Sequence, residues 1–142
     1  MVARGRSRVF IDSGGFIALI YSDDEEHIRA VRYYNSIKAS STFYTTNMVI
    51  SETYTWLRYH TSHPVAVKFL DTIERASKNN ELVIVQVDIS IEEKARQILR
   101  KYGDQNFSYV DAVSFVTLEL LRINDVFGFD THYLIFGKNL HP

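Results

Sequence analysis

Short apolar runs alternate with longer stretches of helical spacing along the chain, and this pattern predicts strands that alternate with helices. Apolar and β-branched runs predict strands over residues 8–11, 43–46, 82–87 and 125–129. Helical patterns predict helices over residues 14–21, 22–39, 48–60, 64–80, 90–102, 108–123 and 131–136. This order favours an α/β sandwich around a mainly parallel sheet.

Local signals support several of the predicted helix ends. Asn47 is a preferred N-cap residue, Pro64 suits the first turn of a helix, and Gly103 is typical of a helix end. Two other helix starts show the capping-box spacing, a serine followed three residues later by a glutamate: Ser22 with Glu25, and Ser90 with Glu93.

Acidic residues occur where a predicted strand ends or a predicted helix begins: Asp12, Glu52, Asp111 and Asp130. Burial of a carboxylate is costly unless a partner compensates it. Ligands of open α/β sheets bind beyond the carboxyl ends of the strands, so Asp12 and Asp130 are expected at one edge. Acids that meet there around a divalent cation indicate metal-dependent chemistry, and cleavage of a phosphodiester is the reaction that we expect.

Each acid also has a purely structural interpretation. Asp12 and Asp130 are suited to cap the helices that follow them. Glu52 lies on the same helix face as Val49 and Trp56, where a carboxylate needs a partner such as an arginine. Caps and metal ligands both use an exposed carboxylate at a strand end, so both interpretations stay open at these positions.

The predicted helix over residues 108–123 is apolar on almost every face. Ser108 and Asp111 match a capping box, while Asp111 and Ser114 share one side and indicate a small polar opening. Asp104 lies in the polar loop before this helix, where a turn is its default role, although an outer metal ligand is the alternative. Independent caps need not converge, whereas metal ligands must.

Composition limits the classes of protein that fit. The chain has 142 residues, 46% hydrophobic and 23% charged, which indicates one globular domain over residues 1–142. We expect no signal peptide and no membrane span. The absence of cysteine excludes disulfides, thiolate metal sites and a cysteine nucleophile, and it fits a cytoplasmic protein.

The formal net charge of −1 argues against nucleic-acid binding through bulk positive potential. It leaves a nuclease open, because clustered acids lower the net charge and a bound metal supplies positive charge locally. Arg4, Arg6 and Arg8 are candidates for a basic arm, although a frayed terminus is the stronger expectation.

The side chains available as ligands favour Mg²⁺ or Mn²⁺ over zinc, because they are hard oxygen donors without cysteine. Tyr109 and Tyr133 lie near the acids in sequence but are expected as packing residues. The histidines show no HExxH-like spacing and are expected at the surface: His27, His60, His63, His132 and His141.

Segments 9–13, 50–53, 107–112 and 127–131 resemble the motifs of the PIN-domain family in order and spacing. At this length the chain most resembles a VapC-type toxin, the ribonuclease of a toxin–antitoxin pair. The resemblance implies a three-layer α/β/α sandwich with a short parallel sheet. It also implies Mg²⁺- or Mn²⁺-dependent cleavage of RNA, with tRNA among the candidate substrates, a small antitoxin partner and a homodimer.

The same resemblance assigns roles to individual residues. It implies that the metal and the catalysis belong to Asp12, Glu52, Asp111 and Asp130, with Asp104 as a further candidate ligand, and that Ser13 and Ser108 support them. Gly14 and Gly15 depart from the bulkier residues of many relatives, which alters the groove near the metal but removes no ligand.

Three other functions fit parts of the pattern. A catalytically silent PIN-like scaffold would bind RNA or protein, but the presence of all four acids argues against it. A Mg²⁺-dependent phosphatase would use Asp12 as nucleophile, but position 14 lacks the second aspartate. A dinucleotide-binding module would need more than the lone pair Gly14 and Gly15.

Overall fold

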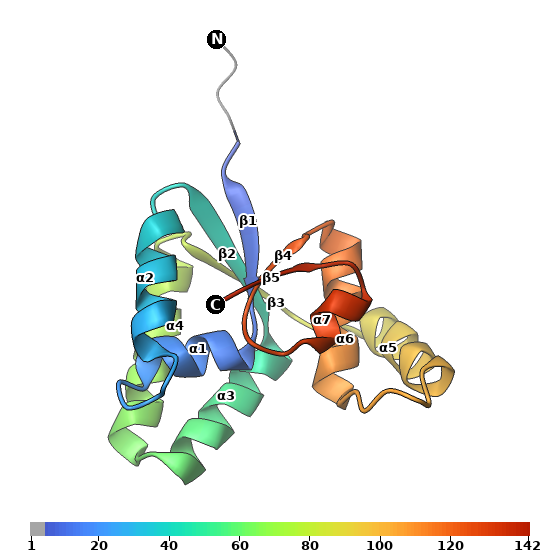
Figure 1. The fold of residues 1–142 in the computed structure, drawn as a ribbon, viewed down its shortest axis with the longest axis horizontal. Helices are drawn as coiled ribbons and strands as arrows, with labels where there is room; N and C mark the ends of the chain where they lie inside the picture. Colours follow the sequence, from blue (N-terminus) through green and yellow to red (C-terminus); the bar gives the residue numbers. More distant parts are fainter. Residues whose placement is uncertain (1–4) are drawn as a thin grey trace.

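The computed structural model describes residues 5–142, and its centre is a parallel sheet of five strands in the order β3-β2-β1-β4-β5 (Figure 1). Every neighbouring pair in this sheet is parallel. The strands are β1 (Ser7–Ile11), β2 (Ser41–Thr46), β3 (Leu82–Val85), β4 (Asp125–Phe127) and β5 (Asn139–His141).

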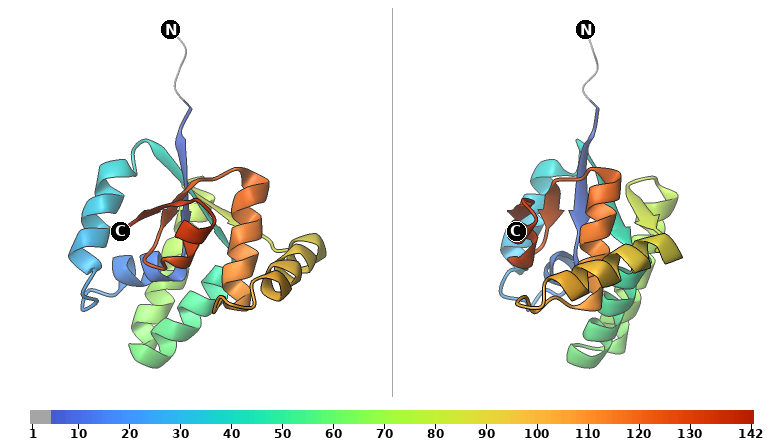
Figure 2. Two further views of the ribbon diagram at one scale, coloured as in Figure 1. Left: turned by 45° about the vertical axis from the view of Figure 1, so that its right-hand side comes forward. Right: turned by 90° about the vertical axis from the view of Figure 1, so that its right-hand side faces the viewer.

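Helices cover both faces of the sheet, as Figures 1 and 2 show. On one side lie α1, α2 and α4, and on the other lies α6 with α5 packed against it. The helices are α1 (Ser13–Ile20), α2 (His27–Ile37), α3 (Asn47–His60), α4 (His63–Lys78), α5 (Ile89–Lys101), α6 (Tyr109–Leu121) and α7 (His132–Ile135). This arrangement confirms the expected α/β/α sandwich.

The central strand β1 is buried on both faces. Val9, Phe10 and Ile11 are at most 4% exposed. Strands of a parallel sheet that is covered by helices on both sides are apolar at consecutive positions, which is why β1 shows no alternation. The next residue, Asp12, lies at the carboxyl end of the strand and is also buried.

The start of α2 differs from the prediction. The capping-box spacing of Ser22 and Glu25 predicted a helix from residue 22, but α2 begins at His27. Residues 22–26 form turns in which the Asp24 carboxylate accepts a hydrogen bond from the backbone N–H of Glu26 (2.9 Å). Such local bonds between an aspartate and the backbone compete with a helical first turn.

Two predicted caps are also wrong by one or two residues. Thr46 caps α3 and Asp88 caps α5, each by accepting a backbone N–H of the first turn, at 3.1 Å and 2.9 Å. Asn47 instead accepts the N–H of Val87 (2.9 Å) and so ties the end of β3 to α3. Ser90 lies inside the first turn of α5. Both true caps have extended backbone, which places their oxygens over the first turn.

The edges of the sheet contain another difference. The pattern predicts no strand near the C-terminus, yet β5 pairs in parallel with β4. Three residues are too few to show a period of two, so only the neighbouring strand makes this segment extended. The strands β3 and β4 are each two residues shorter than predicted, ending at Val85 and Phe127.

The expected basic arm is only partly within the described residues, because Arg4 lies outside them. The Arg6 guanidinium donates hydrogen bonds to Thr42 and to the carbonyls of Ala39 and Ser41, and Arg8 donates to a carbonyl at the end of α6. Arg6 and Arg8 are therefore tied to the fold, and neither a free arm nor a frayed terminus describes them. Within residues 5–142, no helix is long and apolar enough to cross a membrane.

Candidate active site

Asp12 lies at the junction of β1 and α1, with only 6% of its surface exposed. Its backbone N–H donates to the carbonyl of Phe127 (3.1 Å), which joins the ends of β1 and β4. Asp12 occupies the N-cap position of α1, but its side chain makes no capping hydrogen bond. The carboxylate is thus held at the strand end without the role that a simple cap would give it.

Glu52 projects from the second turn of α3 toward the same edge of the sheet. The predicted alternative was a salt bridge to an arginine, but no ion pair to Glu52 is found within residues 5–142. Burial raises the pKa of the Glu52 carboxyl, and repulsion from Asp111 raises it further. A hydrogen bond with the Ser13 hydroxyl acts in the opposite direction and lowers this pKa. Ser13 therefore supports Glu52, as expected for a residue next to the site.

Asp111 is part of a complete capping box at the start of α6. The Ser108 hydroxyl accepts the N–H of Asp111 (3.0 Å), and the Asp111 carboxylate accepts the N–H of Ser108 (2.9 Å). The capping prediction is confirmed, and it uses only one carboxylate oxygen. The capping box fixes the orientation of the Asp111 side chain. The second carboxylate oxygen of Asp111 takes no part in the cap.

Asp130 follows β4 and lies beside His132. The Asp130 Oδ1 atom accepts the backbone N–H of His132 (2.9 Å), whereas the N-cap position of α7 is Thr131. The Nδ1 atom of His132 lies 3.1 Å from Asp130 Oδ1 and 3.7 Å from Asp111 Oδ2. One ligand atom from each of these three residues fits within 4.8 Å of the others.

His132 was expected at the surface, and its position between two acids is therefore a correction. The only sequence signal was its place two residues after Asp130, since a tight turn brings such a side chain back beside the acid. The HExxH spacing gives no signal for His132, because this histidine lies near Asp111 through the fold and not through helical spacing.

The four acids also interact as a group. Burial, with a smaller effect from Glu52 and Asp111, raises the pKa of the Asp12 carboxyl to about 7. Burial likewise raises the pKa of Asp111, and the neighbouring Asp130 adds to this effect. Within residues 5–142, no lysine or arginine pairs with any of the four. Clustered carboxylates without a lysine or arginine partner fit a divalent cation, whose positive charge would relieve this repulsion.

Two buried hydroxyls have no hydrogen bond of good geometry, that of Tyr133 beside Asp12 and that of Ser114 beside Tyr133. Both residues are fully buried. Burial and the charge of Asp12 raise the pKa of Tyr133 well above its ordinary value, so the phenol stays protonated and available as a donor. Ser114 occupies the polar opening predicted for its helix, whereas Tyr133 was expected only to pack.

Two glycines allow the elements around Asp12 to approach closely. A Cβ atom at Gly15 would lie 2.5 Å from the carbonyl oxygen of Phe127, so α1 reaches β4 only without a side chain there. A Cβ atom at Gly128 would lie 3.2 Å from the Asp12 Cβ. Gly15 is therefore required by this contact.

Asp104 lies apart from this group. It is exposed in the loop before α6, and among the described residues it makes no hydrogen bond or ion pair with the other acids. The structure thus brings together the predicted acids and their two serines, while Asp104 has no direct hydrogen bond or ion pair to them among the described residues.

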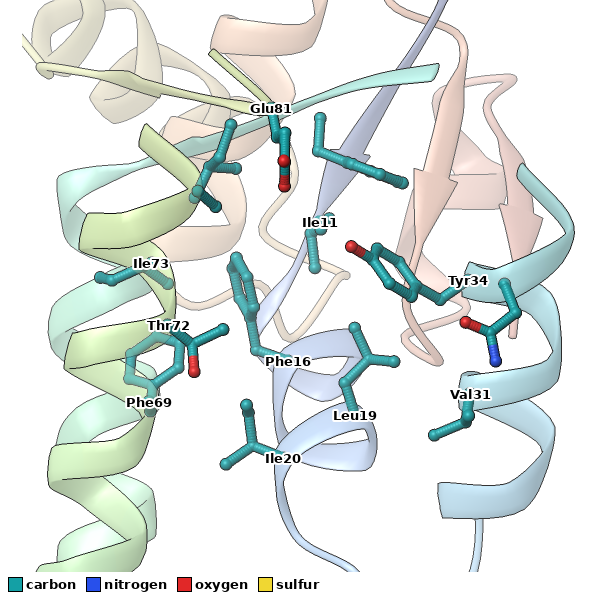
Figure 3. Close-up of a pocket in the computed structure, with 14 residues that line it drawn as sticks. Ile11, Phe16, Leu19, Ile20, Val31, Tyr34, Phe69, Thr72, Ile73 and Glu81 are labelled. Atoms are coloured by element: carbon teal, nitrogen blue, oxygen red, sulfur yellow. The ribbon is translucent and has the colours of Figure 1, made fainter. Parts of the chain in front are cut away.

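Two hollows of different character lie in different parts of the fold. A cavity of about 330 Å³ lies between α1, α2 and α4 and is lined mostly by apolar side chains, including Phe16, Phe69 and Ile73 (Figure 3). None of the four acids lines this apolar cavity. An open groove of about 460 Å³ lies along α3 and includes Glu52. We call the second hollow the α3 groove.

A family model described as "PIN domain" matches residues 9–137, so the chain belongs to the PIN-domain family. Nucleases of this family use divalent metal ions, and the acidic cluster has a donor set of the same kind. The family membership confirms the resemblance seen in the motifs.

The chain is similar to the 23S rRNA-specific endonuclease VapC20 of Mycobacterium tuberculosis, strains CDC 1551 / Oshkosh and ATCC 25618 / H37Rv. It is 28% identical to this relative over 133 residues, which are 91% of this chain and 94% of the relative. The crystal structure of M. tuberculosis VapC20, described as a sarcin-ricin loop cleaving toxin, matches with a TM-score of 0.82 and 26% identity, over 94% of this chain and 99% of that one.

A more distant structural match is FitAcB from Neisseria gonorrhoeae. Its TM-score is 0.65 at 13% identity, over 94% of this chain and 96% of that chain. At this level of identity the likeness concerns the fold alone.

Proposed function

We propose that the protein is an endoribonuclease that cleaves RNA with a divalent metal ion held by Asp12, Glu52, Asp111 and Asp130. The observation that carries the proposal is the convergence of these carboxylates at one sheet edge without a lysine or arginine partner within residues 5–142. Mg²⁺ or Mn²⁺ is the proposed ion, because both prefer hard oxygen ligands.

When bound, such an ion lowers the pKa of a coordinated water and stabilises negative charge on the phosphate as the bond breaks. The protein's own residues prepare the site for it. Ser108 orients Asp111 through the capping box, and the Ser13 hydroxyl lies against Glu52. The hydroxyl of Tyr133 remains protonated beside Asp12 and is available as a donor to its carboxylate.

His132 is proposed to position Asp111 and Asp130. Its Nδ1 atom lies between the two carboxylates, 3.7 Å from Asp111 and 3.1 Å from Asp130. A ring in this position restrains the two acids relative to each other. We assign it a positioning role, whereas Asp104 remains only a candidate outer ligand because it is exposed and apart.

RNA is the proposed substrate, and the name of the M. tuberculosis relative makes ribosomal RNA the first choice to test, before tRNA. The same relative supports the proposal that this chain is the toxin of a toxin–antitoxin pair, neutralised by a small protein. We also propose a single domain over residues 1–142, a homodimer, and a place in the cytoplasm, where its RNA substrate would be met.

The test is cleavage of purified ribosomal RNA and tRNA in the presence of Mg²⁺, Mn²⁺ or EDTA. Discrete cuts that require metal and disappear in Glu52→Gln and Asp111→Asn proteins are the expected result. Glu93→Gln is the matched control, because Glu93 is an exposed acid on α5 outside the cluster. Equal cutting by the wild type and Glu52→Gln would reject these acids.

Metal binding is measured in parallel by calorimetry on the intact protein. We expect Mg²⁺ or Mn²⁺ to bind the wild type and the Glu93→Gln control, and to bind the Glu52→Gln variant more weakly. Absence of both cleavage and metal binding would favour the catalytically silent scaffold instead.

A further inference from the structure

The α3 groove opens beside the acid cluster. Its lining includes Glu52, Trp56, Tyr59 and His60 from α3, and Val110 from the start of α6. Val110 directly precedes Asp111, so two of the four acids lie at or next to this groove. If a phosphate of a polymer binds at the acids, a neighbouring part of the same polymer would therefore lie along α3.

Aromatic side chains continue the row that starts at Glu52. Trp56 and His60 follow Glu52 at intervals of four residues, which places all three on one helix face. With a rise of about 1.5 Å per residue, successive members are about 6 Å apart along the helix axis. A ring at position 56 is therefore close enough to meet a group next to one bound at Glu52.

The rings of this row have fixed orientations. Trp56 and His60 are stacked, with ring centroids 4.5 Å apart and an angle of 10° between their planes. The Nδ1–H of His60 donates to the carbonyl of Trp56 (3.0 Å), and Tyr21 meets Trp56 edge-on at 6.4 Å. These contacts hold the indole in place, so it presents a defined surface to the groove.

Tyr59 differs from its neighbours because 80% of its surface is exposed. Among the described residues it makes no aromatic contact and no side-chain hydrogen bond, so the fold does not use its ring. An exposed tyrosine beside an ordered tryptophan leaves two aromatic surfaces available to a flat ligand. The groove lining contains no lysine or arginine, which makes it poorly suited to a phosphate.

We propose that the α3 groove binds an unpaired base of the RNA strand next to the cleaved phosphate, stacked on Tyr59 and flanked by Trp56. The proposal rests on the proposed ribonuclease function and adds the residues that hold the substrate strand. Proteins recognise single-stranded RNA by stacking unpaired bases on aromatic rings, and a stacking surface needs no positive charge. Continuity with Glu52 favours a base over a protein segment.

The test uses the fluorescence of Trp56, which is the only tryptophan of the chain. The Asp12→Asn protein, in which we expect no cleavage, is titrated with a single-stranded RNA on the order of ten nucleotides long, a length typical of single-strand sites. We expect saturable quenching of the emission. The same strand annealed to its complement should quench far less, because its bases are already stacked and paired.

Substitutions of the exposed ring then separate stacking from general effects. Tyr59→Leu in the same background should raise the Kd for the single strand roughly ten-fold, as expected for loss of one base–ring stack. Tyr59→Phe should bind like the parent, since the ring is kept. Ile28→Ala removes a similarly exposed apolar side chain, 73% exposed on α2 outside the groove, and should leave the Kd unchanged.

The proposal is overturned if the single strand does not quench Trp56, or if Tyr59→Leu and Tyr59→Phe bind alike with the parent's Kd. Light scattering is measured on the same variants. A change of mass in Tyr59→Leu without a change of RNA affinity would identify the groove as a protein interface.

Failure of this proposal is distinguishable from failure of the ribonuclease assignment. Cleavage by the wild-type protein and its loss in Glu52→Gln do not depend on Tyr59. Cleavage that is equally fast in Tyr59→Leu, with an unchanged KM, would reject the groove and leave the nuclease. Quenching without any metal-dependent cleavage would reject the nuclease and leave a base-binding groove.

Discussion

The apolar cavity and the acid cluster are two regions where this fold is imperfectly satisfied, and they differ in what is missing. The apolar cavity between α1, α2 and α4 is unfilled space whose walls are mainly hydrocarbon (Figure 3). The acid cluster lacks positive charge, because Asp12 is almost fully buried among other carboxylates. Unfilled space lowers the stability of the fold, because the side chains around it lose van der Waals contacts. Uncompensated negative charge instead indicates a cationic ligand.

The largest expected effect separates the two regions by activity. Asp12→Asn keeps the shape of the side chain but removes a charged ligand, so RNA cleavage should fall by a factor of roughly 1,000 or more, given the several kcal/mol that metal catalysis supplies. The measurement is initial cleavage rate at saturating Mg²⁺. Asp71→Asn, at an exposed aspartate of α4, is the control. Cleavage near the wild-type rate in Asp12→Asn would remove this residue from the site.

The matching change at the apolar cavity should affect stability and not chemistry. Phe69 is fully buried and meets Phe16 edge-on at 5.3 Å. Phe69→Ala should lower the free energy of unfolding by about 3–5 kcal/mol, as for other large-to-small core changes. Urea unfolding checks this loss. The rate of cleavage per folded molecule should stay unchanged, and a large fall would mean that the cavity and the site are coupled.

Of the two regions, only the acid cluster is expected to make the free energy of unfolding depend on pH. The pKa of Asp12 is about 7 in the folded protein and 3.8 ordinarily, so the folded state binds the extra proton between these values. The stability that comes from the neutral carboxyl is complete below about pH 4 and is lost as the pH rises through about 7. At about 1.4 kcal/mol per pKa unit, the loss is about 4 kcal/mol in metal-free protein.

Asp12→Asn removes this proton equilibrium and serves as the comparison. In EDTA, the variant should be more stable than the wild type at pH 8, and the difference should shrink toward pH 5. Unfolding by urea at a series of pH values measures it. A difference that stays constant from pH 5 to pH 8 would contradict the raised pKa. Addition of Mg²⁺ at pH 8 should stabilise the wild type more than the variant.

Filling the apolar cavity should have a smaller effect of opposite sign. Ala76 lines it from α4, and Ala76→Leu adds hydrocarbon where space exists. We expect a gain of roughly 1 kcal/mol in the free energy of unfolding, because strain offsets part of the added burial. Thermal unfolding measures the gain, and cleavage is the control that should not change. Destabilisation by Ala76→Leu would show that the space is too narrow.

The smallest effect is expected from the hydroxyl of Tyr133. It lies beside Asp12 and slightly lowers the pKa of that carboxyl, against the larger effect of burial. Tyr133→Phe should therefore raise the pKa of Asp12 a little further while the fold is kept. NMR titration of the metal-free protein measures this. An unchanged or lower pKa would show that the phenol does not donate to Asp12.

Much of the fold and site was predictable because the relevant signals are local. The apolar run of β1 predicted its end at Ile11, and the runs of β1 and β4 predicted Asp12 and Asp130 at one edge, although β4 ends two residues earlier than predicted. The capping box of Ser108 and Asp111 depends on residues three apart, and it is confirmed. Family membership agrees with the motifs around these acids. The metal-binding roles themselves stay predictions.

Tertiary structure alone decided the features that depend on residues distant in the chain. Apolar periodicity is read along the sequence, so it predicted the order of the elements apart from β5 and the position of the four acids at strand ends and helix starts. The contact of His132 with Asp111, the pairing of β5 with β4, and the burial of Tyr133 under Asp12 join segments whose meeting depends on the packed sheet. The raised pKa of Asp12 also belongs to this class, because desolvation comes from every element packed around a group and not from its neighbours in sequence.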